Sequence, residues 1–382
     1  MKVLMIVSNP FTNDPRVYNE ARSLVQAGHE VAVIAFDREK CFPPKVTLYG
    51  IQVIRLRTRF SPAHGFGWPL WNGLILLLWQ QQAYNHALLL HKEHPFGAIH
   101  CHDFDTLPVG IRLKRKLGLP LIYDAHEIYE YVMARTFPRW IAKVFSWLEK
   151  GLIKKVDRIV TVSEALERYF NGITDKPISV IMNCKPLESL EYAPPDNEGR
   201  FTVLYIGTLH QGRSIPMLIN TVKQLPDVHC IIGGIGLPDY VQVLKERCDA
   251  VPNVHFVGRV PFDQVIPMTK KANVVLLIIN PQDPNNRLGL GNKQFEAMVC
   301  GRPIICTKGT YSGELTEREE VGLAVEYTQE ALTQAIIKLR DDPKLRQKLG
   351  RNALRAAITK YNWQGQEKKL LELYRDIESG LR

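Results

Sequence analysis

The chain alternates short apolar runs with segments whose apolar residues recur every three or four positions. The first three segments read "KVLMIVS", "DPRVYNEARSLVQAG" and "HEVAVIAF". Unbroken apolar runs of this length favour buried strands, and the helical period between them favours a helix. We therefore predict a βαβ unit at the start of the chain. Asp14 is expected to cap its helix, with Pro15 in the first turn and Gly28 at the end.

The same alternation continues through the first half of the chain. Further strands are predicted at "GAIHCH", "PLIYDAH" and "DRIVTVS", with helices at about 106–117 and 139–153. Short, unbroken apolar strands that alternate with helices indicate a parallel sheet covered on both faces.

A second series of strands and helices begins after a break. The stretch "PLESLEYAPPDNEGRF" has the Pro, Asn, Glu and Gly content of an interdomain connection. Strands are then predicted at "RFTVLYIG", "VHCIIGGIG", "VHFVG", "NVVLLIIN" and "PIICT", with helices between them and to the end. We expect an α/β protein of two doubly wound domains, 1–190 and 200–362. Since ligand-facing loops lie at the carboxyl ends of such strands, two domains placed face to face would enclose a cleft.

The composition is that of a globular protein. The 382 residues are 45% apolar and 23% charged, and the seven cysteines show neither a CxxC pair nor zinc-finger spacing. These cysteines are expected to be reduced thiols of a cytoplasmic protein. The start lacks the features of a signal peptide, and the longest apolar segment, "GLILLLW", falls short of the ~20 residues of a membrane span.

The net charge of +10 lies mainly in the first half. Residues 1–190 hold 24 basic and 17 acidic side chains, which is +7 of the total. Such an excess favours anionic partners, such as nucleotide phosphates, lipid headgroups or nucleic acid. Nucleic acid is the weakest of these, because no module of interleaved aromatic and basic residues is present.

One predicted helix carries aromatic residues between lysines. In "RWIAKVFSWLEKGLIKK", Trp140, Val144, Trp147 and Leu148 form an apolar stripe. We expect this stripe to cover the sheet. The alternative is docking on a membrane surface, which would suit a lipid-linked acceptor. Three further tryptophans raise the same alternative: Trp68, Trp71 and Trp79.

Two turns of the second half have the residues of a phosphate site. In "GLGNK", Gly289 and Gly291 precede a helix start and Lys293 adds a positive charge. In "YIGTLHQGRS", Gly207 ends a strand and Arg213 stands just before a helix. Glycines that only shape a turn and a solvated arginine are the alternative. As a pair, however, Arg213 and Lys293 could clamp one diphosphate.

Taken together, these segments resemble glycosyltransferase family 4, a group of retaining, nucleotide-sugar-dependent enzymes with the GT-B fold. The resemblance runs nearly end to end, on "DPRVYNEARSLVQAGHEVAVI", "YDAHE", "DRIVTVSE", "YIGTLHQGRS", "VHFVGRV" and "GLGNKQFEAMVCGRPII". The Asp-Pro-Arg-Val start and the "NKQFEAM" form look like a branch that acts on cell-surface saccharides. The resemblance also implies that the last helix, about 363–382, completes the first domain.

The resemblance implies a donor site in the second domain. Arg213 stands where the family contacts the diphosphate, Lys293 lies in the donor loop, and Glu296 matches the glutamate that grips the ribose. The remaining implied donor residues are Gly207, Gly289, Gly291 and Asn292, with Arg259 and Val260 beside the base. Glu296 could also simply be an acid favoured near a helix start. Leu288 stands where the common pattern has a second glutamate, which puts the identity of the sugar in doubt.

The first domain supplies the other implied residues. His126 matches the family's "HD" or "HE" pair, which faces the donor sugar, and as a lone histidine it could equally be structural. His126, Arg213 and Lys293 are the implied catalytic groups, and the leaving diphosphate helps to deprotonate the acceptor. Candidates on the acceptor or diphosphate side are Asn13, Arg16, His102 and Glu127.

No metal or other cofactor is expected. Asp103 and Asp105 form a DxD triplet, which binds a divalent metal in the other major glycosyltransferase fold. The triplet lies away from the predicted donor loops, and helix capping by Asp105 is the interpretation that we favour.

The sequence therefore predicts a metal-independent glycosyltransferase with a nucleotide sugar and a saccharide or lipid-linked acceptor as partners. It would act in polysaccharide or glycolipid synthesis in the cytoplasm, with possible peripheral membrane contact through the basic first domain. The alternatives are a nucleotide-sugar epimerase of the same fold, which would form product without an acceptor, and a non-catalytic nucleotide-sugar binding protein, which the loss of an acid at Leu288 suggests.

Overall fold

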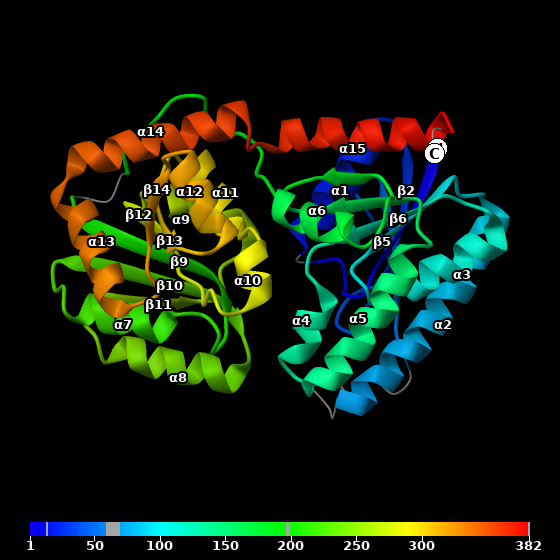
Figure 1. Cartoon of the computed structure of the whole chain (residues 1–382), viewed down its shortest axis with the longest axis horizontal. Helices are drawn as coiled ribbons and strands as arrows, with labels where there is room; N and C mark the ends of the chain where they lie inside the picture. The colour runs from blue at the N-terminus through cyan, green and yellow to red at the C-terminus, as the bar shows by residue number, and fades with distance from the viewer. Residues whose placement is uncertain (13, 59–68, 196–198, 381–382) are drawn as a thin grey trace. The chain divides into compact units, whose positions relative to one another are not determined.

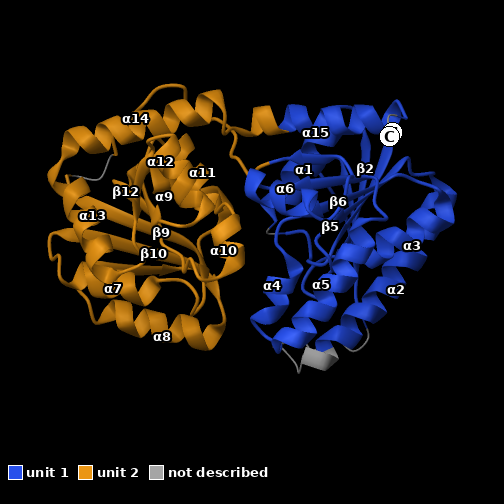
Figure 2. Ribbon diagram, in the orientation of Figure 1, with its two compact units in different colours: residues 1–181, 367–382 blue, residues 182–366 orange. Residues whose placement is uncertain are grey.

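Two α/β units make up the described chain. The computed structural model describes residues 1–12, 14–58, 69–195 and 199–380. Its contacts group Met1–Ile181 with Glu367–Arg382 in one unit and Met182–Gln366 in the other (Figure 2). The sequence-based division assigned 1–190 and 363–382 to the first domain and 200–362 to the second. In the described part of the chain, no helix has the length and apolar character to span a membrane.

The sheet of the first unit has the order β3-β4-β2-β1-β5-β6-β7-β8, and its strands β2, β5 and β6 are labelled in Figure 1. Its strands are β1 Lys2–Val7, β2 Glu30–Phe36, β3 Lys45–Leu48, β4 Ile51–Leu56, β5 Ala98–His102, β6 Leu121–Ala125, β7 Arg158–Thr161 and β8 Ile178–Val180. The predicted parallel sheet is confirmed, except that β3 runs antiparallel to β4. The pattern analysis did not predict β3, β4 or β8.

Helices cover both faces of this sheet. They are α1 Pro15–Gln26, α2 Pro69–Glu93, α3 Leu107–Leu117, α4 Tyr129–Ala134, α5 Arg139–Ile153, α6 Glu164–Asn171 and α15 Trp363–Glu378. On β5, His100 points toward α15, because its Nδ1 lies 2.9 Å from the hydroxyl of Tyr374. Cys101 points the other way, since a Cβ on Gly110 of α3 would collide with its sulfur. This alternation confirms the expected double coverage.

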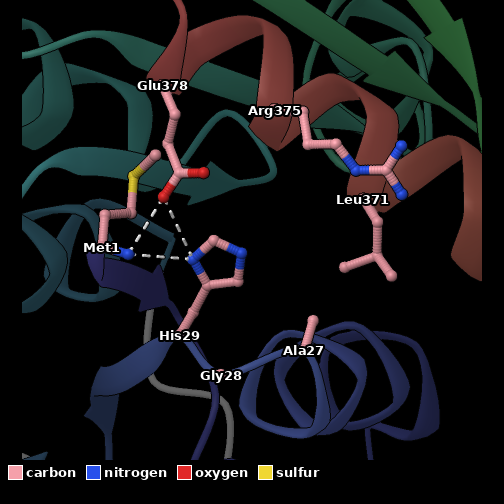
Figure 3. A pocket seen from close by; sticks show the side chains of 7 residues that line it. All are labelled: Met1, Ala27, Gly28, His29, Leu371, Arg375 and Glu378. Carbon is pink, nitrogen blue, oxygen red and sulfur yellow. Dashed lines mark hydrogen bonds and ion pairs between the residues drawn. The ribbon is translucent and has the colours of Figure 1, made fainter.

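Helix α15 belongs to the first unit from Glu367 onward although it follows the second unit in sequence, and its first turn up to Gln366 is grouped with the second unit (Figure 2). Its Glu378 carboxylate accepts a hydrogen bond from the amino group of Met1 at 3.0 Å, and Nδ1 of His29 lies 3.2 Å from that amino group (Figure 3). A pocket of about 400 Å³ beside them is lined by α15 and the end of α1. Met1 precedes β1, so this pocket lies at the amino edge of the sheet, whereas ligand loops follow the carboxyl edge.

Both predicted carboxylate caps are wrong. Asp14 occupies the N-cap of α1, but its carboxylate accepts hydrogen bonds from Arg16 and Asn9 instead of from a helix amide. Asp105 does not cap α3, whose N-cap is Thr106. Its carboxylate accepts hydrogen bonds from the hydroxyls of Ser8 at 3.2 Å and Tyr129 at 2.7 Å. Partners near in sequence engage Asp14, and partners brought in by the tertiary fold engage Asp105, so neither carboxylate caps its helix.

The sheet of the second unit is wholly parallel, in the order β11-β10-β9-β12-β13-β14 (Figure 1). Its strands are β9 Phe201–Leu209, β10 Val228–Gly236, β11 Val254–Gly258, β12 Val274–Leu277, β13 Ile304–Thr307 and β14 Gly322–Val325. The first five were predicted. The sixth, β14, lies in a region that was predicted as helical.

The helices of this unit are α7 Ile215–Lys223, α8 Pro238–Asp249, α9 Phe262–Lys271, α10 Pro284–Leu288, α11 Asn292–Val299, α12 Tyr311–Arg318, α13 Gln329–Asp341 and α14 Pro343–Thr359. Alternate residues of β9 face the two layers. Val203 and Tyr205 pack in the cluster that includes α7, α8 and α13, while Leu204 and Ile206 pack with α9. This packing fixes β9, so that its last residues are held at the carboxyl edge of the sheet.

Candidate functional site

A glycine and a lysine from distant segments meet at the carboxyl edge of the second sheet. Gly207 lies near the end of β9 and Lys293 is the second residue of α11. A Cβ on Gly207 would lie 2.7 Å from Nζ of Lys293. The neighbouring strand adds Gly234, which pairs with Gly207 and has φ +144°, where an added Cβ would collide with Gly207. Glycine at 207 therefore leaves the space that the lysine ammonium occupies.

The ammonium of Lys293 lies in an electrostatically unfavourable place. Burial and the charge of Arg213 lower its pKa to about 7, against a smaller opposing effect of Glu296. Its Nζ lies 4.3 Å from the ring centroid of Tyr205, a contact that favours the cation only modestly. Two cationic side chains thus share one region, and an anion bound between them would relieve their repulsion.

Arg213 lies in the turn between β9 and α7. Its backbone amide donates to the carbonyl of His210 at 2.9 Å, and the turn bridges to Ile279 beyond β12. Its Nε is buried, and no hydrogen-bond partner for it is found among the described residues. A buried guanidinium nitrogen without a partner marks a position where a ligand oxygen would be stabilised.

The start of α11 adds backbone donors. Gly291 is its N-cap, and no side chain caps the helix in the described structure. The φ angles of Gly289 and Gly291 are −84° and −80°, so neither glycine is needed for a left-handed conformation. Instead, a Cβ on Gly291 would lie 2.9 Å from Leu277 and one on Gly289 would lie 2.9 Å from the carbonyl of Asn285. The glycines therefore hold the loop close to β12, with the first amides of α11 at the sheet edge.

Glu296, predicted to grip the ribose, has a partner that the sequence did not reveal. Its Oε1 lies 3.2 Å from Nζ of Lys185, and both side chains are almost completely buried. Nζ of Lys185 also lies 5.2 Å from the ring centroid of Phe262. Because Lys185 is in an irregular segment before β9, no periodic pattern could have identified it. This ion pair fixes the position of the Glu296 carboxylate.

The other predicted donor residues lie in different surroundings. Val260 packs against β10, because its Cγ2 would lie 2.7 Å from a Cβ added to Gly233. Gly233 is the residue before Gly234 on that strand. Arg259 is exposed just after β11. Asn292 opens α11, and its Oδ1 is buried without a partner among the described residues. Leu288 ends α10, a short helix that the sequence analysis had not predicted.

In the first unit, His126 is held by a carboxylate. It follows β6 directly, and its Nε2 lies 2.8 Å from Oδ2 of Asp124. The same oxygen lies 2.9 Å from Nδ1 of His102 on the neighbouring strand. Burial would raise the pKa of Asp124, but His126 and the two histidine hydrogen bonds hold it well below its usual range. His126 Nδ1 is buried, and no hydrogen-bond partner for it is found among the described residues.

Sequence reasoning missed Asp124, and three of the residues predicted on the acceptor or diphosphate side have partners that it did not foresee. His102 is 2% exposed, its Nδ1 is bonded to Asp124, and its Nε2 is buried without a hydrogen-bond partner among the described residues. Arg16 is engaged by Asp14, with its Nε and Nη2 at 3.0 and 3.1 Å from the two carboxylate oxygens. Glu127 is exposed, 3.9 Å from Nη1 of Arg135. Asn13 lies outside the described residues.

Arg16 also lowers the pKa of its partner, Asp14. Burial would raise the pKa of Asp14, but the charge and hydrogen bond of Arg16 outweigh it and lower that pKa to about 2. The guanidinium is thus neutralised in place, which makes it a poor anion contact.

Behind His126 lies a buried polar cluster of Glu20, His100, His102 and Asp124. One atom from each lies within 4.8 Å of the others, a donor set that a divalent cation could use. Burial, the charge of Asp124 and a hydrogen bond to it raise the pKa of Glu20 well above its usual range. Glu20 Oε2 and Asp124 Oδ1 are buried without a hydrogen-bond partner among the described residues, and a protonated Glu20 would place a hydrogen between the two carboxyl groups without a metal ion.

We expect Glu20→Gln to leave the free energy of unfolding almost unchanged, because the amide also donates a hydrogen to Asp124. Glu20→Ala should lower it by about 1 to 3 kcal/mol, since a buried acceptor loses its partner. Denaturant unfolding at neutral pH measures both variants. Equal destabilisation by Gln and Ala, or a tightly bound metal in the wild-type protein that Gln removes, would refute the shared proton.

Two glycosyltransferase family models match this chain. A family model described as Glycosyltransferase Family 4 matches residues 16–188, and one described as Glycosyl transferases group 1 matches residues 200–342. An uncharacterized glycosyltransferase of Methanocaldococcus jannaschii is 24% identical over 93% of this chain and 92% of its own. The alpha-D-kanosaminyltransferase of Streptomyces kanamyceticus is 22% identical over 69% of this chain and 72% of its own.

Solved structures share the fold from end to end. Sucrose-phosphate synthase of Thermosynechococcus elongatus superposes with a TM-score of 0.82 at 19% identity, covering 100% of both chains. Anabaena HepE in complex with UDP-glucose gives a TM-score of 0.72 at 17% identity, over 98% of this chain and 100% of its own. The fold is GT-B, and the two family models together span most of the sequence. The chain therefore belongs to the glycosyltransferases of the family 4 type, as the sequence predicted.

Proposed function

We propose that the protein transfers a sugar from a nucleotide diphosphate to a saccharide or lipid-linked acceptor, with retention at the anomeric carbon. The observation that carries this proposal is the pair of Arg213 and Lys293 at the sheet edge, where burial and mutual repulsion lower the pKa of the lysine. An anion of two or more charges is the ligand that such a pair stabilises most. HepE, which shares the fold, has been solved with UDP-glucose.

In this mechanism, the second unit neutralises the leaving group. Arg213, Lys293 and the first amides of α11 would take up the charge that develops on the diphosphate, without a metal ion or other cofactor. Glu296, held by Lys185, would bind the ribose hydroxyls, and Val260 and Arg259 would border the base. The departing diphosphate would accept the acceptor's proton.

We propose that His126 contacts the transferred sugar through Nδ1. With Nε2 on the Asp124 carboxylate, the ring is fixed in orientation, and a protonated ring would donate from Nδ1 to a sugar oxygen. Asp124 and His102 are then positioning residues. The absence of an acid at Leu288 removes one expected contact to the sugar, so the donor sugar is to be identified by experiment.

The proposed cellular role is polysaccharide or glycolipid synthesis on the cytoplasmic side. A nucleotide-sugar epimerase is the alternative within the fold, and it would convert its substrate without an acceptor. A binding protein without catalysis would neither transfer the sugar nor convert the nucleotide sugar.

A thermal-shift screen tests the proposal first. The full chain is heated with UDP, GDP and their sugars, and with the monophosphates as controls. A ligand at ~100 times its dissociation constant adds ~2.7 kcal/mol of stability. We expect the diphosphates to stabilise more than the monophosphates. The best donor is then incubated with and without acceptor in the presence of a chelator, and NMR identifies the anomeric configuration. A product formed without acceptor, or no turnover of any donor that binds, would overturn the transferase proposal.

Nucleoside diphosphate affinity should fall as pH rises above about 7. In the free protein Lys293 loses its proton in this range. A bound diphosphate would raise its pKa, so that binding takes up a proton and affinity drops up to tenfold per pH unit. The terminal phosphate, with a pKa near ~6, keeps its charge there. Arg213 and Glu296 are the charged side chains that act on the Lys293 ammonium.

Calorimetry in two buffers of different ionisation enthalpy measures that proton uptake at about pH 8. Lys293→Arg, whose charge does not titrate, should bind with no uptake and a flat pH dependence. An affinity of the wild-type protein that is constant between about pH 7 and 9 would place the diphosphate away from Lys293.

A further inference from the structure

Helix α5 exposes a strip of large apolar side chains. Trp140 is 69% exposed, Val144 48%, Trp147 73% and Leu148 39%. The sequence analysis had favoured packing of this stripe on the sheet, and that prediction is wrong. The residues that α5 buries are Ala142, Ser146, Glu149 and Ile153. These four residues face the protein, and the two tryptophans of the helix face outward.

The tryptophans that the sequence grouped with this stripe do not all share its surroundings. Trp79 of α2 is fully buried, stacked on Phe36 with ring centroids 5.1 Å apart. Trp68 lies outside the described residues, as does the side chain of Trp71. The exposed tryptophans of α5 are thus a feature of that helix, and the core does not require them.

The charges around the strip have one sign. Its exposed neighbours on and just after α5 are Arg139, Lys143, Lys150, Lys154 and Lys155. The one acid of the helix, Glu149, is buried and accepts a hydrogen bond from the hydroxyl of Tyr123 at 2.9 Å. At 100° per residue, Arg139, Lys143, Lys150 and Lys154 line one side of the tryptophans, and Lys155 lies among the apolar residues on the other.

This combination matches the surface of an anionic bilayer. Tryptophan is enriched at the depth of lipid headgroups, where its ring is apolar and its N–H still finds water. Lysine stems can lie along apolar surface while their ammonium groups reach the phosphates. An amphipathic helix with lysines beside its apolar strip binds in the plane of the interface. An acidic protein surface would satisfy the lysines but would leave two tryptophans with no matching pocket.

We propose that α5 docks the protein on a membrane surface rich in anionic phospholipid, with Trp140 and Trp147 inserted at the headgroup level. This extends the proposed use of a lipid-linked acceptor and rests on it for its biological meaning. Lipid binding itself is a separate property, which can be present or absent whatever the donor and the reaction are.

The test is flotation of the full chain with vesicles. One set is phosphatidylcholine alone, and the other adds phosphatidylglycerol at roughly one part in three, because each lysine near an anionic surface strengthens binding about fivefold. We expect binding to the mixed vesicles at least tenfold stronger than to the neutral ones, and weakened by salt. Tryptophan fluorescence should shift to shorter wavelength on binding.

Two variants separate the apolar and charged contributions. Trp140→Ser with Trp147→Ser should abolish the fluorescence shift and reduce binding at least tenfold, and Lys143→Glu with Lys150→Glu should remove the preference for anionic lipid. Val243→Ser with Lys245→Glu on α8 of the second unit is the matched control, because both side chains are exposed there and should leave binding unchanged. All variants should keep the wild-type nucleotide affinity, so that failure of the lipid proposal does not affect the donor proposal.

Three results would overturn the proposal. The protein could fail to bind either vesicle, or the double tryptophan variant could bind as well as the wild type. Alternatively, sedimentation could show a dimer of the wild-type chain that the tryptophan variant dissociates, which would make the strip an interface between two copies.

Discussion

Arg213→Ala is expected to weaken binding of a nucleoside diphosphate by about 10- to 150-fold. A hydrogen bond to a charged group contributes about 1.5 to 3 kcal/mol, and the buried Nε of Arg213 has no competing partner in the described structure. The change has a second effect, because the charge of Arg213 contributes to the lowered pKa of Lys293. Without the arginine, Lys293 should keep its proton to higher pH, so the loss of affinity should be larger at pH 7 than at pH 8.5, where the wild-type lysine is mostly neutral.

Titration calorimetry of the full chain with UDP and GDP measures this effect. Arg213→Lys keeps the charge but loses the planar fork, and should fall between the wild type and the alanine variant. Arg247→Ala on α8 is the matched control, since that arginine is exposed and far along the chain from the site residues. Unchanged affinity for Arg213→Ala, with the protein still folded, would remove Arg213 from the site.

The second large effect is expected at His126. His126→Ala should lower kcat for transfer by about 10² to 10⁴, the range of a side chain that donates a proton or hydrogen bond in the transition state. Affinity for the free nucleoside diphosphate should stay within about threefold of the wild type, because the residues proposed to bind the diphosphate all lie in the second unit. The kinetics of donor turnover measure the fall in kcat, and calorimetry with the free nucleotide measures the affinity.

Asp124→Asn distinguishes the positioning residue from the group it holds. The carboxylate accepts from both His102 and His126 through one oxygen, and an amide oxygen can still do so without the charge. Because a protonated ring is the proposed donor, the loss of the Asp124 charge should move the alkaline limb of the pH–activity profile to lower pH, besides reducing kcat about 10- to 100-fold. His86→Ala, an exposed histidine of α2, serves as control. If Asp124→Asn altered stability but left the pH profile unchanged, Asp124 would be purely structural.

The parts of the fold that sequence reasoning predicted follow from periodicity. The strands β1, β2, β5, β6, β7 and β9–β13 are short apolar runs, and the helices between them carry a helical repeat. Strand β3 was missed because its residues are exposed or half-exposed, and β4 was missed because Gln52 and Arg55 interrupt its apolar residues. Strand β14 has four residues, Gly322–Val325, and pairs only with β13, so the local pattern carried too little information to identify it.

The site was predictable where topology alone brings residues together. Gly207, Arg213 and Lys293 follow strands of one parallel sheet, and loops at carboxyl ends converge. The partnerships of charged groups were not predictable. They depend on side-chain contacts in three dimensions. In the structure Arg16 binds Asp14, Glu296 pairs with Lys185, and the carboxylate of Asp124 holds His126. Exposure of Trp140 and Trp147 likewise depended on which face of α5 meets the protein.

The most direct measurement is a crystal structure of the full chain with UDP or GDP, whichever stabilises it more. The account predicts that the two phosphates lie at the carboxyl edge of the second sheet, within hydrogen-bond distance of the side chains of Arg213 and Lys293 and of the first amides of α11. The ribose hydroxyls should meet Glu296. Phosphates bound elsewhere, with Arg213 and Lys293 left without contact to them, would contradict it.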